Sequence, residues 1–178
     1  MQHRARSLVV LAAAVATVAA VSCKKDSAGV AAVNTTPVSN IVTFRANLTS
    51  GAEVPPNATT GYGTFVATLD TVTNVFTYDL TFTGLSANVS NGHIHGPALA
   101  TANSGTTINF NTLPGATFSF GAQAGTGHGV VVLNAASSIT ATMSGDSLKK
   151  LLFAGLTYAN IHTTANAGGE VRGQITKQ

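Results

Sequence analysis

Cysteine, tryptophan and charged residues are scarce in this chain of 178 residues. Its one cysteine excludes an intramolecular disulfide, so stability has to come from core packing or from a bound metal. Without tryptophan it has no obvious platform for stacking on a sugar ring. Charged residues are only 8%, yet aliphatic residues and phenylalanine are plentiful. This composition is typical of a globular protein rather than a charge-rich disordered one.

A strong positive charge is also missing from the body of the chain. The formal net charge is +3, but Arg4 and Arg6 lie in a segment that we expect to be removed. Without those two, seven of the nine Lys and Arg residues stand against six Asp and Glu. Phosphate backbones are bound through clustered positive charge, so we do not expect nucleic acid as a partner.

Residues 1–22 have the three parts of a secretory signal peptide. A positive start is followed by an apolar run from Leu8 to Val21, and small residues then precede Cys23. As a helix this run would be about 21 Å long, shorter than the roughly 30 Å hydrocarbon layer of a bilayer. We therefore expect cleavage before Cys23 rather than a permanent membrane helix.

The residues before Cys23 resemble a bacterial lipobox, in which the cysteine thiol is lipidated and becomes the new N-terminus. The segment is Ala-Val-Ser-Cys, with Ala20 where leucine is usual. The resemblance implies an exported chain anchored to a bacterial membrane through a lipid on Cys23, in the periplasm or at the cell surface. Plain secretion is the alternative. Residues 23–40 are mostly small and polar, which favours a flexible tether.

From residue 41 onward, apolar residues alternate with polar ones, as they do in half-buried strands. The alternation is cleanest from Phe76 to Phe82, and residues 70–74 before it favour a turn, which predicts a hairpin. Further short strands are expected at 92–95, 107–110, 117–121, 129–133, 139–143, 156–163 and 170–176. This spacing predicts an all-β domain over residues 41–178, built as an antiparallel Greek-key-like sandwich or barrel.

One segment is expected to be helical. Ser144 and Asp146 are suited to the start of a helix, three leucines follow at helical spacing, and Gly155 is suited to its end. The pattern predicts a short helix near residues 146–154.

Four motifs in this order resemble the chordin-type (CHRD) domain. They are GAEVPP from Gly51, HIHGP from His93, GLTYANIHT from Gly155 and GEVRGQI from Gly169. The likeness covers roughly residues 41–178. The family is named for repeats in a secreted antagonist of growth factors, and a shared fold does not by itself supply a function.

Histidines at two of these motifs are candidate metal ligands. His93 and His95 project from one face of a strand, because side chains two residues apart in a strand point the same way. His162 lies in another predicted strand, and the three imidazoles converge if the two strands are neighbours. Neutral imidazole suits copper and zinc. His128, between two glycines on an expected loop, is a candidate fourth ligand.

Other interpretations of the histidines remain open. They could be partly buried donors to backbone carbonyls in a purely structural or adhesive module that binds another protein. The H-x-H strand also resembles that of copper/zinc superoxide dismutases, which would imply a copper redox enzyme. That family adds a zinc-site cluster, a bridging histidine and a disulfide, none of which is found in this sequence.

The sequence thus favours a binding module without catalytic residues. No motif in the sequence identifies a protein partner. Glu170 and Arg172 alternate along one face of the last predicted strand. We expect them to form a structural polar pair that aligns strands through charge-assisted hydrogen bonds.

Overall fold

The structure is a computed structural model, and it describes residues 40–134, 138–140 and 143–178. The chain divides into two units, Met1–Thr36 and Pro37–Gln178, and the described residues all belong to the second. The predicted signal peptide, Cys23 and the tether up to residue 39 lie outside the described residues. Among the residues that the structure describes, no helix has the length and apolarity needed to cross a bilayer.

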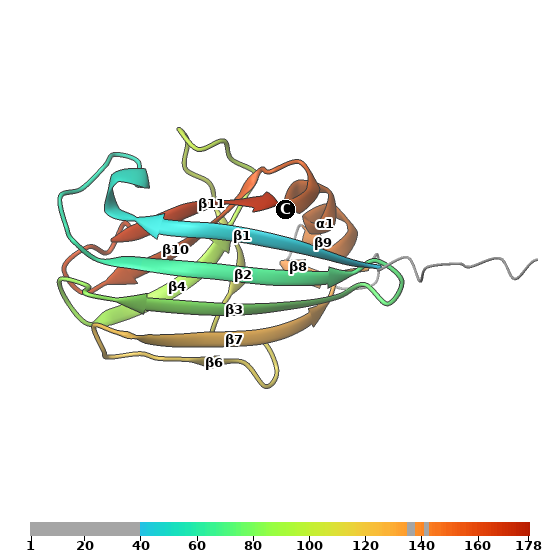
Figure 1. Cartoon of the computed structure of the whole chain (residues 1–178), viewed down its shortest axis with the longest axis horizontal. Helices are drawn as coiled ribbons and strands as arrows, with labels where there is room; N and C mark the ends of the chain where they lie inside the picture. The colour runs from blue at the N-terminus through green and yellow to red at the C-terminus, as the bar shows by residue number, and fades with distance from the viewer. Residues whose placement is uncertain (1–39, 135–137, 141–142) are drawn as a thin grey trace, which may run out of the picture. The chain divides into compact units, whose positions relative to one another are not determined.

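Nine strands form one antiparallel sheet that curls into a half-barrel (Figure 1). In chain order they are β1 (Ile41–Thr49), β2 (Tyr62–Asp70), β3 (Val75–Thr83), β4 (Val89–His95), β5 (Thr106–Asn109), β6 (Thr117–Phe118), β7 (Gly125–Val132), β10 (Thr157–Thr163) and β11 (Val171–Lys177). Their order across the sheet is β5-β4-β10-β11-β1-β2-β3-β7-β6. The short strands β8 (Ser138–Thr140) and β9 (Met143–Ser144) pair separately. The predicted all-β antiparallel fold is confirmed.

The predicted hairpin joins β2 and β3. The carboxylate of Asp70 accepts hydrogen bonds from the backbone N–H groups of Val72 and Thr73, at 2.8 and 3.1 Å. Asn74 has a φ of 60°, in the left-handed region that asparagine tolerates better than most residues. The turn therefore forms for the reasons that its sequence indicates, and it sets the register in which Leu69 lies opposite Phe76.

The helix is also confirmed, and it packs beside β8 and β9. This helix, α1, spans Gly145–Phe153. A short 3-10 helix, η1 (Ser50–Ala52), directly follows β1. The Ser144 hydroxyl accepts a hydrogen bond from the backbone N–H of Ser147, which caps the first turn. The leucines at positions 148 and 152 are fully buried.

Several predicted strands differ in extent from the observed ones. Residues 117–121 are strand only at Thr117–Phe118, because Gly121 adopts a φ of 67° and its N–H bonds to the carbonyl of Val89. Residues 139–143 give the two short strands β8 and β9 rather than one. The strand expected from residue 129 begins at Gly125, which places His128 within β7.

Aromatic rings fill the inside of the curled sheet. The ring of Phe110 lies 5.0 Å from Tyr78 and 5.7 Å from Phe118, and the Tyr78 hydroxyl donates to the Phe110 carbonyl. Phe110 directly follows β5, at one edge of the sheet, whereas Phe118 lies on β6 at the other. These contacts therefore close the curl around one shared core.

The outer face of β4, β10 and β11 carries the polar residues of the family-like motifs. On β10, Ala159 and Ile161 point into the core, so Tyr158, Asn160 and His162 point to the opposite face. Three loops meet over this face, at residues 50–57, 96–105 and 164–169. They are joined by side-chain hydrogen bonds, such as those from the amides of Asn103 to Val54 and of Asn57 to Glu170.

Candidate metal centre

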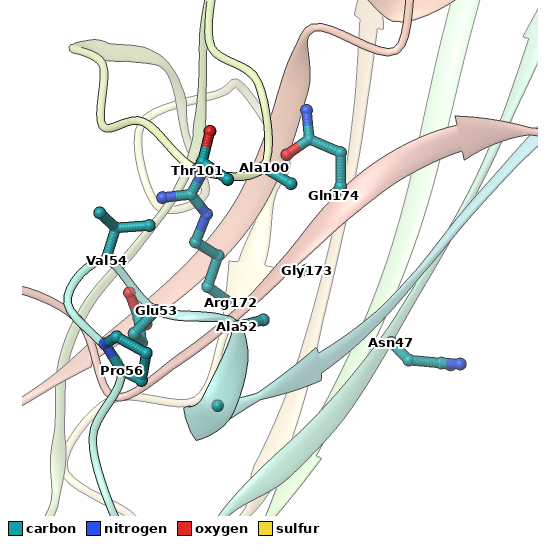
Figure 2. A pocket seen from close by; sticks show the side chains of 11 residues that line it. Asn47, Ala52, Glu53, Val54, Pro56, Ala100, Thr101, Arg172, Gly173 and Gln174 are labelled. Carbon is teal, nitrogen blue, oxygen red and sulfur yellow. The ribbon is translucent and has the colours of Figure 1, made fainter.

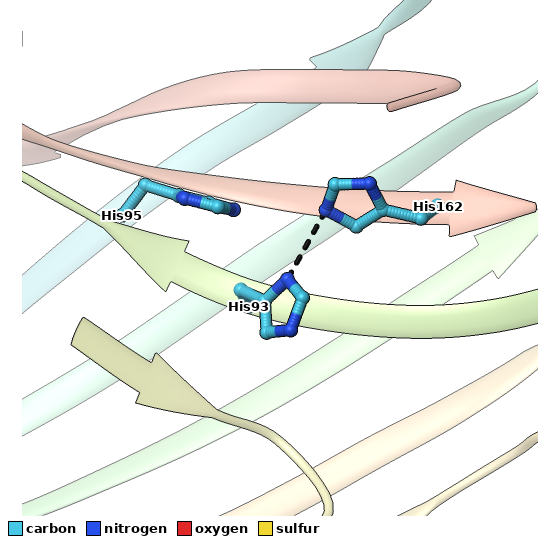
Figure 3. A group of neighbouring side chains, drawn as sticks. All are labelled: His93, His95 and His162. Atoms are coloured by element: carbon cyan, nitrogen blue, oxygen red, sulfur yellow. Dashed lines mark hydrogen bonds between the residues drawn. The ribbon is translucent and has the colours of Figure 1, made fainter. Parts of the chain in front are cut away.

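The three histidines of the predicted site come together on the outer face of β4 and β10 (Figure 3). The two strands are antiparallel neighbours, and His93 lies opposite Asn160, two residues before His162. One ring nitrogen from each histidine lies within 4.8 Å of the others. Nitrogen ligands about 2 Å from one tetrahedral ion are roughly 3.3 Å apart, so small side-chain shifts suffice for all three to share an ion.

Backbone carbonyls hold two of these rings. Nδ1 of His95 lies 3.0 Å from the carbonyl oxygen of Ser104, and Nδ1 of His162 lies 2.9 Å from that of Ala167. A carbonyl only accepts, so Nδ1 carries the proton in both rings, and Nε2 of each neutral ring has a lone pair that can accept a hydrogen bond or bind a metal. Metal-binding histidines are commonly oriented in this way.

The lone pairs of the two held rings differ in their surroundings. Nε2 of His162 lies 3.1 Å from Nδ1 of His93, which donates to it when both rings are neutral. Nε2 of His95 is buried and has no hydrogen-bond partner among the described residues. A buried acceptor without a donor costs about 1–3 kcal/mol, and a metal ion would supply the missing partner.

Burial keeps all three rings neutral. It lowers the pKa of His93 to about 4, with a further lowering by the neighbouring His162 and His95. Burial also lowers the pKa of His95 to about 4, although its bond to Ser104 acts in the opposite direction. The pKa of His162 is lowered by burial as well. At neutral pH the cluster therefore offers uncharged nitrogen donors, which is the form that binds metals.

A layer of aromatic and charged side chains supports His95. Its ring stacks on that of Tyr158 with centroids 4.8 Å apart and 9° between the planes. The Tyr158 hydroxyl accepts from the backbone N–H of Ser104 at 3.2 Å, so tyrosine and histidine hold the same loop residue. This arrangement fixes both the position and the tilt of the His95 ring.

Arg172 of β11 holds the loop from the other side. Its side chain is 1% exposed and donates to the Asn103 side chain and to the carbonyls of Leu99 and Ala102 at 2.8–3.2 Å. Asn103 in turn donates to the carbonyl of Val54. The loop that positions His95 is thereby fixed to the last strand and to the 50–57 loop.

His128 lies on β7, away from the loop position expected for it. Its Nδ1 is 2.9 Å from the Asp79 carboxylate on β3, and it does not belong to the cluster of three histidines that the described residues contain. The neighbouring glycines explain the difference. At Gly127 and Gly129 a side chain would run into the rings of Phe118 and Tyr78, so these glycines serve close packing within a strand, not a loop.

Glu170 and Arg172 do not bond to each other, and each holds a different loop. Glu170 accepts hydrogen bonds from Ser86, from the Thr163 hydroxyl at 2.6 Å and from the Asn166 amide at 3.2 Å. The carboxylate that faces Arg172 is instead that of Glu53. Both residues therefore make charge-assisted hydrogen bonds, each to its own loop rather than to the other.

The three histidines were predicted from the sequence, but the residues that support them were not. Tyr158 and Asn160 precede His162 at intervals of two in the GLTYANIHT motif, so alternation alone places them on the same face as the histidine. Ser104 and Ala167 act through their carbonyls, and a backbone carbonyl leaves no signature in the residue type. Glu53 belongs to the GAEVPP motif, but only the fold brings it to Asn160 and Arg172.

The fold and the site together define a class: a curled antiparallel β domain with a partly buried histidine cluster on its outer face. The family model described as CHRD domain matches residues 44–175, which is most of the chain. The chain therefore belongs to the CHRD domain family. No curated protein matches it, and no solved structure does.

Proposed function

We propose that this CHRD domain is a binding module that holds one transition metal ion, copper or zinc, through His93, His95 and His162. The observation that carries the proposal is the buried Nε2 of His95, which has no hydrogen-bond partner in the described part of the chain and belongs to a cluster of three converging imidazoles. The two carbonyl-held rings cannot turn their Nδ1 atoms to the ion without losing a hydrogen bond. Their Nε2 atoms are therefore the preferred ligand atoms.

The ligand set narrows the choice of metal. Three neutral nitrogens and no thiolate suit copper or zinc better than the harder magnesium or calcium ions, which prefer oxygen. Three protein ligands would leave one position of a tetrahedral ion for water or for a group from another molecule. A bound ion would replace the hydrogen bond between His93 and His162.

Export and lipid anchoring complete the proposal. The signal-like residues 1–22 and the lipobox-like segment ending at Cys23 support a domain held on a bacterial membrane, in the periplasm or at the cell surface. Binding there, without catalysis, is the activity that we propose. The lack of other cysteines in the chain also suits a site that relies on nitrogen rather than on oxidisable sulfur.

A purely structural or adhesive module is the second candidate. The bonds of His95 to Ser104 and of His162 to Ala167 favour it, because they tie strands β4 and β10 to the loops whether or not a metal binds. In that case the histidines stabilise a surface that engages another protein. Metal binding and this role make opposite predictions for titration.

Calorimetric titration of copper and zinc into the protein starting at Lys24 tests the proposal. We expect one ion per chain, with affinity reduced at least about 100-fold in His95→Ala and in His162→Ala, since each loses one of three ligands. His128→Ala is the matched control, because it removes a histidine from β7 and should leave affinity unchanged. Equal affinities in all four proteins would contradict the proposal and favour the structural module.

The same preparations separate binding from redox catalysis. A copper enzyme would turn over superoxide or peroxide faster when loaded with copper than an equal amount of free copper does. We expect no such excess. Turnover above that of free copper that disappears in His95→Ala would show that the protein is a redox enzyme and not only a binding module.

A further inference from the structure

A second candidate site lies on the outer side of β11, between the 50–57 and 96–105 loops (Figure 2). It is a cavity of about 440 Å³, within the range of small-molecule sites. Its walls are mainly apolar and include Ala52, Val54, Pro56 and Ala100. Polar groups enter it from Glu53, Arg172 and Gln174, and none of the three metal-site histidines lines it.

Glu53, which lines this cavity, carries an unsatisfied acceptor. The residue is 5% exposed, and its Oε2 accepts from the Asn160 amide at 3.4 Å. Its Oε1 is buried and has no hydrogen-bond partner among the described residues. This oxygen lies against Gly169, which does not line the cavity, so Glu53 gives the wall a carboxyl group rather than an acceptor for a ligand.

Gln174 brings an acceptor to the cavity, and the fold determines which end of its amide is free. Its Nε2 donates to the carbonyls of Ala98 and Gly155, at 2.9 and 2.7 Å. Only the NH₂ group of the side chain can donate to two carbonyls, so the nitrogen and oxygen of the amide cannot exchange places. Its Oε1 is therefore left in the cavity wall, buried and without a partner in the described part of the chain.

Charge in the cavity wall disfavours an ionic ligand. The Arg172 guanidinium lies near the Glu53 carboxyl, whose pKa burial raises to about 7 although Arg172 and Asn160 act to lower it. A cation would meet the permanent charge of Arg172, which the loop carbonyls already hold. An anion would meet the carboxyl group of Glu53 and the unsatisfied acceptor of Gln174. A neutral molecule avoids both conflicts.

We propose that this cavity binds a small neutral aliphatic molecule that carries an N–H or O–H donor, such as a primary amide or an alcohol. Its apolar body lies against the alanine, valine and proline side chains, and its donor satisfies Oε1 of Gln174. The proposal is independent of metal binding, because it uses neither the histidines nor the loop carbonyls that hold them.

Titration of the protein with four branched probes, followed through backbone amide chemical shifts, tests the proposal. Isobutyramide and isobutanol have neutral donors, 3-methyl-2-butanone has nearly the same shape without one, and isopropylamine is a cation. We expect saturable shifts at Ala52, Ala100 and Gly173 with the first two probes. The ketone and the amine should bind at least about tenfold more weakly, the loss that one missing hydrogen bond to a buried acceptor produces.

Two variants locate the binding. Ala100→Phe fills the cavity without removing a polar contact and should abolish the saturable shifts. Leu99→Phe enlarges the preceding exposed residue, which does not line the cavity, and should preserve them. Absence of saturation with both donor probes, equal binding of the ketone, tighter binding of the amine, or unchanged binding to Ala100→Phe would each overturn the proposal. Metal titration of the same variants keeps this test separate from that of the histidine cluster.

Discussion

The guanidinium carbon of Arg172 lies 3.5 Å from the centre of the Tyr158 ring. The same ring stacks on His95, and because β10 lies between β4 and β11, the two contacts come from opposite sides. A cation–π contact in a desolvated setting is worth up to about 2 kcal/mol. The Tyr158 ring thereby connects Arg172 of the last strand to His95, a candidate metal ligand on β4.

Substitutions of Tyr158 should separate its ring from its hydroxyl. Tyr158→Phe keeps the stack on His95 but loses the bond to Ser104, so we expect about 1 kcal/mol less stability and metal affinity reduced severalfold. Tyr158→Leu also loses the stack, and we expect a loss of about 3 kcal/mol and of at least tenfold in affinity. Urea unfolding and calorimetry measure the two effects.

A tyrosine elsewhere provides the control for these two variants. Tyr62 is 58% exposed, and Tyr62→Leu should change neither stability nor metal affinity appreciably. If Tyr158→Leu retains the affinity of the unsubstituted protein, the stack does not position His95.

Glu170→Gln should change how the free energy of unfolding depends on pH. Burial acts to raise the pKa of Glu170, but hydrogen bonds from Thr163, Ser86 and Asn166 outweigh it and lower the pKa below its usual value of 4.5. A carboxyl group with a lowered folded-state pKa stabilises the protein above the unfolded value. That contribution is lost as the pH falls from about 4.5 through the folded pKa.

Urea unfolding of the metal-free protein at several pH values between about 7 and 3 measures this effect. The unsubstituted protein should be the more stable one at neutral pH, and the two stabilities should approach each other in acid. Parallel curves with a constant separation would show that the charge on Glu170 is not the cause.

The sequence predictions that were confirmed rest on the alternation of side chains along strands. The features that the sequence did not predict depend on contacts between residues far apart in the chain. The shared face of His93 and His95 follows from strand geometry alone. Their meeting with His162 depends on β4 and β10 being neighbours, which a pattern in either strand does not determine. The geometry of a loop leaves no periodic pattern in the sequence, and for that reason the contacts of the Ser104 and Ala167 carbonyls were not predicted.

Gly129→Ala should destabilise the domain by about 1–3 kcal/mol, as overpacking of a core does. A methyl group at this position of β7 would overlap the ring and hydroxyl of Tyr78. Gly105→Ala is the matched control, since a methyl group there meets nothing within 4 Å and should leave stability nearly unchanged. Thermal unfolding compares the two. Similar midpoints for both variants would contradict the explanation of why glycines flank His128.

Cys23→Ser should abolish lipid attachment and leave the domain folded. Lipidation requires the thiol, which a serine hydroxyl does not replace, so lipid label and membrane association should both be lost. Ser22→Ala keeps a small residue before the cysteine and should still be labelled. Because Pro37–Gln178 forms a compact unit of its own, the thermal midpoint and metal affinity of the Cys23→Ser protein should match those of the unsubstituted protein. Persistent labelling of Cys23→Ser would instead show that Cys23 is not the anchor.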